Sequence, residues 1–343
     1  MKIPQKYIET IEKINSYLAL LTLTILLYLI IFKSPHRLGT YKYLMTYLSI
    51  FEMVYAGLMI LSLPQIYTKD SGFFVVMNRN VTGENFRIFN IFYFAMFSTS
   101  MANFSVHFVY RFLAIKGYKS WTQFSPSKLL IYISCPLIVG IADTVVVITF
   151  WGENESTQWF MRQVIMKISE NLENLSFIGF CIIAQDENSI KYINWHSIIG
   201  IAAACLLITF SMIIMLYFGI KCYSAIRNLT NISTVSQNYR SIQNQLFFAL
   251  VIQTAIPLIL MHLPSAIILI TCCLECSPEI LGQITAIFIS FYPVLDPLPN
   301  IFIIKAYRNA FFNFLSCCFQ KVGPAPSESS STLPRNVVSI MKP

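Results

Sequence analysis

Long runs of apolar side chains, separated by short polar stretches, recur along most of the chain. A helix needs about 20 apolar residues to cross the hydrocarbon core of a bilayer, and these runs have that length. They lack the strict alternation of a transmembrane β-strand and any repeat of solenoid length. The pattern therefore predicts seven membrane-spanning helices, at residues 11–32, 43–66, 88–112, 129–150, 197–220, 246–271 and 281–304.

The composition favours lipid as the surroundings of most of these residues. Hydrophobic residues make up 56% of the 343 residues, charged residues make up 12%, and the mean hydropathy is +0.62. Soluble domains have about 25% charged residues. We therefore predict an all-α membrane protein, a bundle of seven transmembrane helices. The first run has no signal-peptide cleavage site, so we expect it to be retained as a helix.

The charges between the helices predict which way the chain crosses the membrane, because cytosolic loops are rich in lysine and arginine. One set of loops contains fifteen basic residues and a single acid, and the opposite set contains nine basic and twelve acidic residues. The basic set comprises residues 33–42, 111–128, 221–245 and the segment from Lys305 onward. We therefore expect residues 1–10 to be extracellular and the C-terminal tail to be cytosolic.

The net charge of +8 fits contact with anionic lipids and cytosolic partners. Basic residues do not interleave with stacking aromatics on a soluble module, so no nucleic acid is expected as a partner. No motif for a cofactor is present. A zinc site among the outer cysteines is disfavoured because no histidine lies in that loop, so we predict no metal site.

Four cysteines lie in the segments predicted to be outside: Cys181 and the three of the "CCLEC" cluster, Cys272, Cys273 and Cys276. Disulfides persist in that compartment. One interpretation is a bridge from Cys181 to the cluster, and the other is free thiols at the membrane rim. Connectivity cannot be read from a sequence, so both interpretations stay open.

Acceptor triplets for N-glycosylation occur in the predicted outer loops at Asn80, Asn154 and Asn174. The same triplet also occurs in segments predicted to be in the membrane or the cytosol, so the motif does not decide the topology. Given the topology from the loop charges, Asn80 and Asn154 are the sites we expect to carry a glycan. Asn174 lies in a more apolar stretch.

Three carboxylates are placed within the predicted helices: Glu52, Asp143 and Asp296. Each costs roughly 2.5–3.5 kcal/mol near the middle of a bilayer, so each is expected to face the bundle interior and find a partner. Glu52 and Asp296 both lie roughly 12–14 Å from the cytosolic edge of their helices. We interpret them as an activation switch between the second and seventh helices. A static polar contact is the alternative.

Prolines surround Asp296 in the stretch "FYPVLDPLPN". Pro293 and Pro297 each remove a backbone donor, which frees carbonyl groups and kinks the helix. A kinked helix that carries an aspartate can switch between two packings, so both prolines are assigned to the switch. Pro257 and Pro264 suggest a second hinge in the sixth helix.

The segment "HFVYRF" ends the third helix on its cytosolic side. Arg111 lies at the membrane edge, where its guanidinium can reach a partner on a neighbouring helix. The alternative for Arg111 is a simple membrane anchor. His107 lies one turn deeper and is assigned to the switch, with a packing role as its alternative.

These stretches resemble the nematode seven-transmembrane chemoreceptors of the Str class, a branch of odorant-receptor-like serpentine receptors. The resemblance rests on "LGTYKYLM", "HFVYRF", "QLFFALVIQTAIPLILMHLPS" and "YPVLDPLPNIFIIKAYR" and covers nearly the whole chain. It implies a bundle like that of G-protein-coupled receptors, a small odorant or other chemical as ligand, and the plasma membrane of a sensory cilium as location. It also implies a heterotrimeric G protein as partner, and we assign Tyr110 and Arg111 to G-protein coupling on that ground. The chain departs from the rhodopsin-type pattern, since "VYRF" replaces a DRY triplet and "YPVLDPLP" replaces NPxxY.

A ligand pocket is expected in the outer half of the bundle, because small-molecule sites form as mostly apolar cavities between helices. Depth along the helices is the criterion for the lining residues. They are Phe92, Met96, Thr99, Asp143, His262, Gln283 and Phe288.

A membrane channel or transporter is the alternative function. The absence of an inverted repeat and of a ring of charges disfavours it. An intramembrane enzyme is not expected, because the sequence contains no GxSxG, HExxH or paired membrane aspartate motif.

A short amphipathic helix is predicted after the seventh span, at residues 305–321, lying on the inner leaflet. Cys317 and Cys318 would then lie at acyl-chain depth, where palmitoylation is favoured. In the alternative, the phenylalanines prolong the seventh helix and the thiols stay free. Residues 322–343 are rich in proline and serine and are predicted to be a disordered cytosolic tail.

Overall fold

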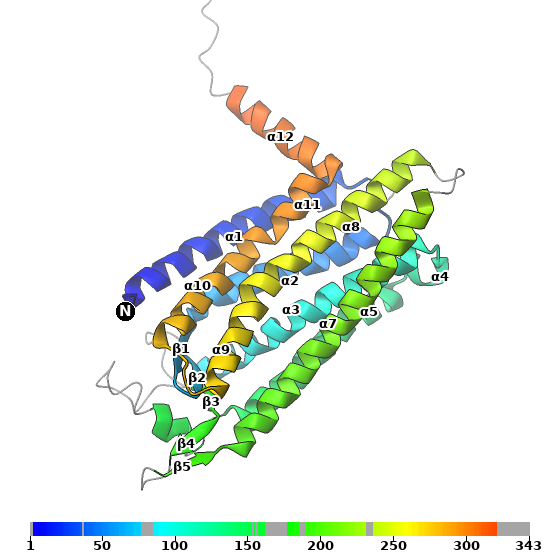
Figure 1. Cartoon of the computed structure of the whole chain (residues 1–343). Helices are drawn as coiled ribbons and strands as arrows, with labels where there is room; N and C mark the ends of the chain where they lie inside the picture. Colours follow the sequence, from blue (N-terminus) through cyan, green and yellow to red (C-terminus); the bar gives the residue numbers. More distant parts are fainter. Residues whose placement is uncertain are drawn as a thin grey trace, which may run out of the picture.

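The computed structural model describes residues 3–35, 38–76, 85–152, 154, 157–161, 177–185, 190–230 and 236–320. Long helices pack together in one bundle, and short strands cover one end of it (Figure 1). This architecture confirms the predicted helical bundle. The long helices are α1 (Gln5–Lys33), α2 (Tyr41–Ser62), α3 (Asn85–Ile115), α5 (Pro126–Phe150), α7 (Trp195–Thr230), α8 (Gln237–Pro257) continued by α9 (Leu263–Cys273), and α10 (Glu279–Leu295) continued by α11 (Pro297–Ile303).

Several helices extend beyond the spans inferred from hydropathy. α1 begins at Gln5 and α7 runs to Thr230, because backbone hydrogen bonds continue into the polar flanks that hydropathy excludes. α2 ends earlier than residue 66. Leu63 adopts a left-handed conformation with φ of 42° and Pro64 follows, a combination that ends a helix.

Among the described residues, six helices are long and apolar enough to cross a membrane: Gln5–Lys33, Tyr41–Ser62, Pro126–Phe150, Trp195–Leu229, Gln237–Cys273 and Glu279–Ile303. α3 has 31 residues but carries polar side chains along its middle. Ser98, Ser100 and Asn103 are each only 1% exposed. α3 packs against α2, α5, α7 and α8, so protein rather than lipid surrounds these groups. We therefore assign α3 as the seventh span.

Gly140 allows α5 to approach α3 closely. A Cβ added at Gly140 would lie 2.1 Å from Thr99 Oγ1 and 3.1 Å from the Ala95 carbonyl oxygen. Small residues permit such close helix contacts in membranes. Thr99 donates to the Ala95 carbonyl over 2.6 Å, which holds its side chain against the helix backbone at this contact.

Gly140→Ala is therefore expected to destabilise the bundle by about 1–3 kcal/mol, the usual cost of overpacking. The measurement is the midpoint of thermal unfolding in detergent. Gly57→Ala in α2 is the matched control, because a Cβ at Gly57 would meet nothing within 4 Å. Equal midpoints for the two variants would contradict the close contact between α3 and α5.

A three-stranded antiparallel sheet covers one end of the bundle. It consists of β1 (Gln65–Lys69), β2 (Gly72–Val76) and β3 (Phe177–Cys181), with β2 in the centre. We call this the outer end, following the orientation predicted from the loop charges. A second hairpin, β4 (Ile183–Gln185) with β5 (Lys191–Ile193), follows directly. The sequence interpretation assigned no strands here, and the structure corrects it.

The disulfide that was one interpretation of the outer cysteines is not formed among the described residues. Cys181, Cys272, Cys273 and Cys276 are all free thiols. Cys181 is buried in β3, where its sulfur lies 3.7 Å from Nδ2 of Asn194. Burial raises the pKa of the Cys181 thiol to about 11. The bridge hypothesis is therefore wrong for this structure, and the free-thiol interpretation holds.

The cytosolic end of the bundle carries α4 (Lys119–Thr122), between α3 and α5, and α12 (Lys305–Gln320), which leaves the bundle at an angle (Figure 1). The Tyr307 hydroxyl shares a hydrogen bond of 2.7 Å with Ser34 and fastens α12 to the end of α1. Phe312 and Phe314 are 50% and 62% exposed. α12 is thus the helix predicted after the seventh span.

Several predictions fall outside what the structure describes. Residues 322–343 and the sequons at Asn80 and Asn174 lie outside the described residues, and the side chains of Cys317 and Cys318 are not described either.

Candidate functional site

A cavity of about 280 Å³ lies between the helices below the sheet, and we call it the bundle cavity. Its walls come from α3, α5, α7, the sixth helix including α9, α10, and all three strands of the sheet. Aromatic side chains form much of the lining: Phe73, Tyr93, Phe94, Phe97, Trp151 and Phe180. Apolar walls with a few polar groups are typical of sites for small molecules.

Asp143 and His262 bring ionisable groups to the wall of the bundle cavity. Asp143 is 4% exposed and His262 is 8% exposed. Oδ1 of Asp143 and Nε2 of His262 have no hydrogen-bond partner among the described residues. The imidazole of His262 packs on the ring of Phe97, with centroids 4.8 Å apart. Because unpaired buried polar atoms are costly, these two atoms are suited to pair with a bound molecule.

The sheet and Trp151 cover the bundle cavity on its outer side. The rings of Phe73 and Phe180 stack across β2 and β3 with centroids 5.3 Å apart. Trp151 packs against Phe180 at 5.2 Å. Ile66 of β1 also lines the cavity. A ligand in the cavity is thus separated from the outer solvent by packed side chains.

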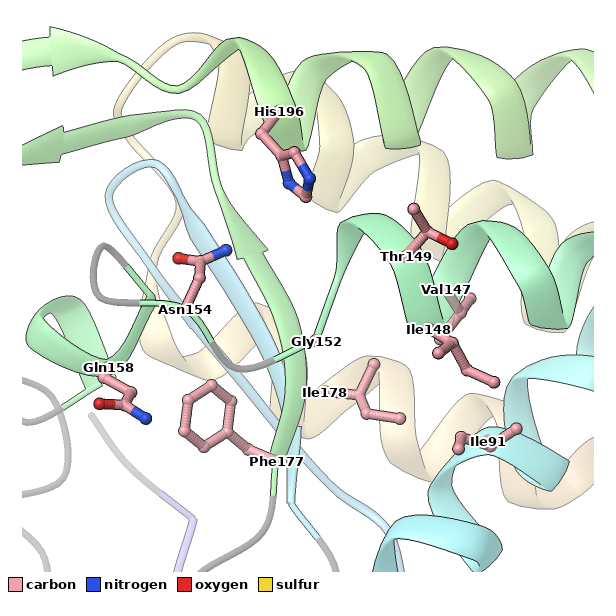
Figure 2. A pocket seen from close by; sticks show the side chains of 10 residues that line it. All are labelled: Ile91, Val147, Ile148, Thr149, Gly152, Asn154, Gln158, Phe177, Ile178 and His196. Carbon is pink, nitrogen blue, oxygen red and sulfur yellow. The ribbon is translucent and has the colours of Figure 1, made fainter.

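A second cavity of about 400 Å³, the outer cavity, lies beside the outer ends of α5 and α7 (Figure 2). His196 of α7 and Phe177 and Ile178 of β3 line it, together with Asn154 and Gln158. The amide oxygen of Asn154, one of the predicted glycosylation sites, accepts from the Thr157 backbone N–H over 2.9 Å. The outer cavity is more polar than the bundle cavity and lies at the edge of the bundle, so it suits water better than an apolar ligand.

Five of the residues predicted for the ligand pocket do not line the bundle cavity, and Asp143 and His262 do. Phe92 and Phe288 are 46% and 41% exposed on the surface of the helices. Met96 and Thr99 are buried in helix contacts, and Thr99 meets Gly140. Depth was the criterion for these residues, and depth does not fix the rotation of a helix. The cavity face of α3 instead carries Tyr93, Phe94 and Phe97.

Gln283 has a different role from the one predicted. Its side chain pairs with the backbone of Ile3 at both ends of the amide. The Ile3 N–H donates to Oε1, and Nε2 donates to the Ile3 carbonyl, each over 3.0 Å. Gln283 therefore anchors the N-terminal segment to α10. The sequence offered no signal for this contact, because an amide that binds backbone looks the same as one that binds a ligand.

Glu52 and Asp296 meet in the inner half of the bundle, and both are 0% exposed. Their carboxyl groups lie close enough to interact with each other. Tyr292 donates to Oε1 of Glu52 over 3.5 Å, and Nε2 of Gln253 donates to Oδ2 of Asp296. Two like charges this close would repel each other, so the two carboxyl groups and their amide and hydroxyl neighbours form one coupled polar contact.

The seventh helix is interrupted at Asp296, which separates α10 from α11. Pro293 lies inside α10 and Pro297 opens α11. Neither proline can donate to the carbonyl four residues before it, so the interruption follows from their position. Asn300 of α11 donates to Oε1 of Gln253 over 3.0 Å. Gln253 of α8 therefore contacts both Asp296 and α11.

Arg111 is 2% exposed, so other parts of the protein cover its guanidinium. Its Nη2 donates to the backbone carbonyl of Gln243 on α8 over 2.9 Å. Its guanidinium lies 5.1 Å from the ring centroid of Tyr41. Among the described residues no acidic side chain forms a salt bridge with it. Arg111 therefore links α3 to the inner end of α8.

Tyr110 and His107 surround this link, and both are buried. The ring of Tyr110 stacks on Tyr41 at 5.5 Å, and its hydroxyl donates to the Thr122 carbonyl over 3.3 Å. Nδ1 of His107 lies 3.2 Å from the Tyr41 hydroxyl. His107 thus lies beside Tyr41, the residue that Arg111 also contacts. The prediction grouped His107 with Glu52 and Asp296, but among the described residues no hydrogen bond or ring contact joins it to that pair.

The sixth helix changes its hydrogen-bond spacing between Pro257 and Pro264. Leu258–His262 forms a π-helical turn, η2, in which the Leu263 N–H donates to the Leu258 carbonyl. Such turns occur mostly as single insertions within α-helices. His262, the last residue of the turn, lines the bundle cavity. The turn therefore lies where the cavity meets the inner half of the helix.

Glu12 is a buried carboxylate that the sequence interpretation missed. It lies within the first predicted span but was counted among the outer charges. Glu12 is 0% exposed, and neither of its carboxyl oxygens has a hydrogen-bond partner among the described residues. Its neighbours include the hydroxyls of Tyr55 and Tyr93, whose rings stack at 6.0 Å. The sequence did contain a signal for this residue, because Glu12 is an acid just inside the boundary of a predicted span.

The model of the serpentine type 7TM GPCR chemoreceptor Str family matches residues 8–312. The chain belongs to this family.

Two Str relatives are curated proteins of Caenorhabditis elegans. G-protein coupled receptor str-217 is 32% identical over 315 residues, which cover 90% of this chain and 89% of the relative. Serpentine receptor class r-10 is 31% identical over 310 residues, covering 89% and 88%. Both names describe receptors rather than enzymes.

The fold of this Str receptor is also that of a solved structure. Squid rhodopsin superposes with a TM-score of 0.64 at 12% sequence identity, over 96% of this chain and 91% of rhodopsin. At that identity the likeness concerns the fold alone. It confirms the seven-transmembrane architecture of a multi-pass membrane protein.

Proposed function

We propose that this Str receptor binds a small, largely apolar odorant or other chemical in the bundle cavity and then activates a heterotrimeric G protein at its cytosolic face. The observation that carries the proposal is the cavity itself, an apolar chamber with unpaired polar atoms on Asp143 and His262. We place the receptor in the plasma membrane, at the cilium of a sensory neuron.

The cavity's size and lining support a particular ligand chemistry. Its volume of about 280 Å³ is at the low end for small-molecule pockets, so the ligand is smaller than a typical drug. The aromatic wall favours apolar surface. Oδ1 of Asp143 can accept a hydrogen bond from the ligand or, when the acid is protonated, take part in donating one, and the imidazole of His262 pairs with either a donor or an acceptor.

The sixth helix supports a route from the cavity to the inner face. His262 lies at the cavity, and Gln243 of the same helix accepts the hydrogen bond from Arg111. A ligand that favours one packing of the π turn moves the inner part of the same helix, which carries Gln243. That movement exposes Arg111. The Glu52–Asp296 pair contacts the same helix through Gln253, so it biases the same movement.

The predicted modifications stay predictions. Glycans are proposed at Asn80 and Asn154, with Asn174 as a third acceptor, and palmitate is proposed at Cys317 and Cys318. The amphipathic α12 that carries these cysteines supports the second proposal, because its exposed phenylalanines suit an inner-leaflet surface.

The test begins with a screen of volatile and water-soluble compounds in cells with a calcium readout. Asp143→Asn and His262→Phe are then expected to lose about 1.5–3 kcal/mol of ligand affinity, or roughly 10- to 100-fold in potency. Phe92→Leu is the control, because Phe92 lies on α3 but faces outward.

Two results would count against the proposal. The first is unchanged potency in both cavity variants at normal surface expression. The second is ligand-evoked ion flux through purified receptor in vesicles without any G protein, which would establish the channel or transporter alternative.

A further inference from the structure

The bundle cavity is closed on its outer side but not on every side. Phe180 of the sheet is 4% exposed, and Tyr93 and Phe94 of α3 are 3% and 7% exposed. Other lining residues are both part of the cavity wall and exposed at the surface: Cys205 and Thr209 on α7, and Ala266 on α9. The exposed part of the wall is therefore the seam between α7 and α9.

The exposed side chains along this seam are small: Cys205 and Thr209 of α7 and Ala266 of α9. The larger lining residues of the same helices are only partly exposed: Ile208, Met212 and Leu269. Small residues on facing helices leave space that large ones would fill. Neighbouring large residues turn outward instead, with Leu206 71% exposed and Ile267 42% exposed. The opening thus lies between two helices whose surroundings are apolar.

The depth of the seam places it within the hydrocarbon of the outer leaflet. Cys205 lies ten residues into α7 from its first residue, Trp195, which is roughly 15 Å along the helix. Ala266 lies seven residues from the end of α9 at Cys273, or roughly 10 Å. Measured from the outer ends of these helices, Ala266 falls within the half-thickness of about 15 Å of a bilayer core, and Cys205 falls at about its middle. The seam therefore faces acyl chains rather than water.

We propose that ligands enter the bundle cavity sideways from the outer leaflet, between α7 and α9. This inference rests on the proposed function in one respect, the assignment of the cavity as the ligand site. The ligands are small molecules that partition into membranes, because an apolar solute is concentrated in the bilayer and reaches the seam without crossing the sheet. Phe73 and Phe180 then act as a lid and not as an entrance.

The route can be tested without a known ligand or any signalling. The side chains at positions 204 and 205 are exchanged (Ala204→Cys, Cys205→Ala), which moves the thiol from the exposed seam to a buried cavity position. Purified receptor in phosphatidylcholine vesicles is treated with N-phenylmaleimide, which is neutral and lipophilic. A parallel sample receives the charged reagent trimethylammonium-ethyl methanethiosulfonate in water. Mass spectrometry of the peptide that contains residue 204 gives the labelling rate.

We expect the neutral reagent to label Cys at position 204 and the charged reagent not to label it. Adding Ala266→Trp to close the seam should slow the neutral reaction about tenfold, equivalent to roughly 1.4 kcal/mol in the barrier. Ile267→Trp is the matched control, because Ile267 is the next residue of α9 and is not part of the cavity wall. Thr209→Phe closes the seam from α7 and replaces Ala266→Trp if that variant fails to fold.

An equal labelling rate in the closed-seam and control variants would overturn the proposal. A second result would also overturn it. If a Phe73→Ala variant is labelled faster by the charged reagent, and Ala266→Trp does not slow its labelling by the neutral reagent, the entrance lies at the sheet. Labelling is independent of G protein and agonist. If the receptor does not signal, the proposed function fails but the entry route still stands. If a closed-seam variant still responds to ligand, the entry route fails but the proposed function still stands.

Discussion

Replacing Arg111 by alanine is expected to abolish ligand-evoked G-protein activation while ligand binding stays measurable. In the structure the guanidinium is buried, donates to the Gln243 carbonyl and lies over the ring of Tyr41. It becomes available to a partner only when the inner end of α8 moves away. Coupling energies between a ligand site and such an element are about 1–3 kcal/mol, or roughly 5- to 150-fold. Agonist-dependent nucleotide exchange on a purified G protein is the measurement.

Two control variants separate position from charge in that experiment. Lys221→Ala removes a cytosolic-side cation that is exposed beside Tyr217, and it should change nucleotide exchange by less than about twofold. Arg111→Lys keeps the charge but loses the planar fork, so it should recover only part of the activity. Agonist-independent activity in Arg111→Ala would show that Arg111 only restrains α8. Parent-like coupling would show that it is a packing residue.

Asp296→Asn is expected to shift agonist potency or basal signalling by about tenfold, within the range of allosteric couplings, while surface expression stays close to the parent. Asparagine keeps the volume and can still accept from Gln253, but it removes the negative charge that the carboxyl group can carry. Asp296→Ala removes the acceptor of the Gln253 Nε2 donor and the carboxyl group beside Glu52. It should lower the free energy of unfolding by about 1–3 kcal/mol.

A double-mutant cycle tests whether the two carboxyls act as a unit. If Glu52 and Asp296 share a proton, the effects of Glu52→Gln and Asp296→Asn on signalling are non-additive by about 0.5–3 kcal/mol. Glu12→Gln provides a matched carboxyl-to-amide change on α1, away from the pair. Additive effects, or an Asp296→Asn receptor that signals like the parent, would reduce the pair to a static contact.

The sequence was sufficient to predict the bundle because lipid imposes a simple length and polarity rule on each span. It also placed Glu52 and Asp296 at matching depths, and the structure puts them in contact. Depth along a helix follows from counting residues. Which neighbour a buried acid meets is then constrained by the cost of leaving it alone in the membrane.

Rotation of a helix and irregular outer structure were not predictable in the same way. On α3, protein surrounds most faces, so hydropathy does not distinguish Phe92, which faces outward, from Tyr93, which lines the cavity. The sheet depends on pairing β2 with β3 across about a hundred residues of chain, and no local pattern encodes that partner. Arg111 looked like an edge residue because the length of α8 beyond its apolar part was unknown.

The π turn at Leu258–His262 has a consequence for comparing related receptors. Its hydrogen bonds span one more residue than those of an α-helix, so everything outward of it is rotated by about 100° relative to a continuous helix. Gain or loss of one residue at this place would present a different face of α9 to the cavity and leave Gln243 in its place. Ligand preference can therefore diverge between lineages through a single codon insertion, and aligned positions beyond residue 262 are equivalent only between receptors that share the turn.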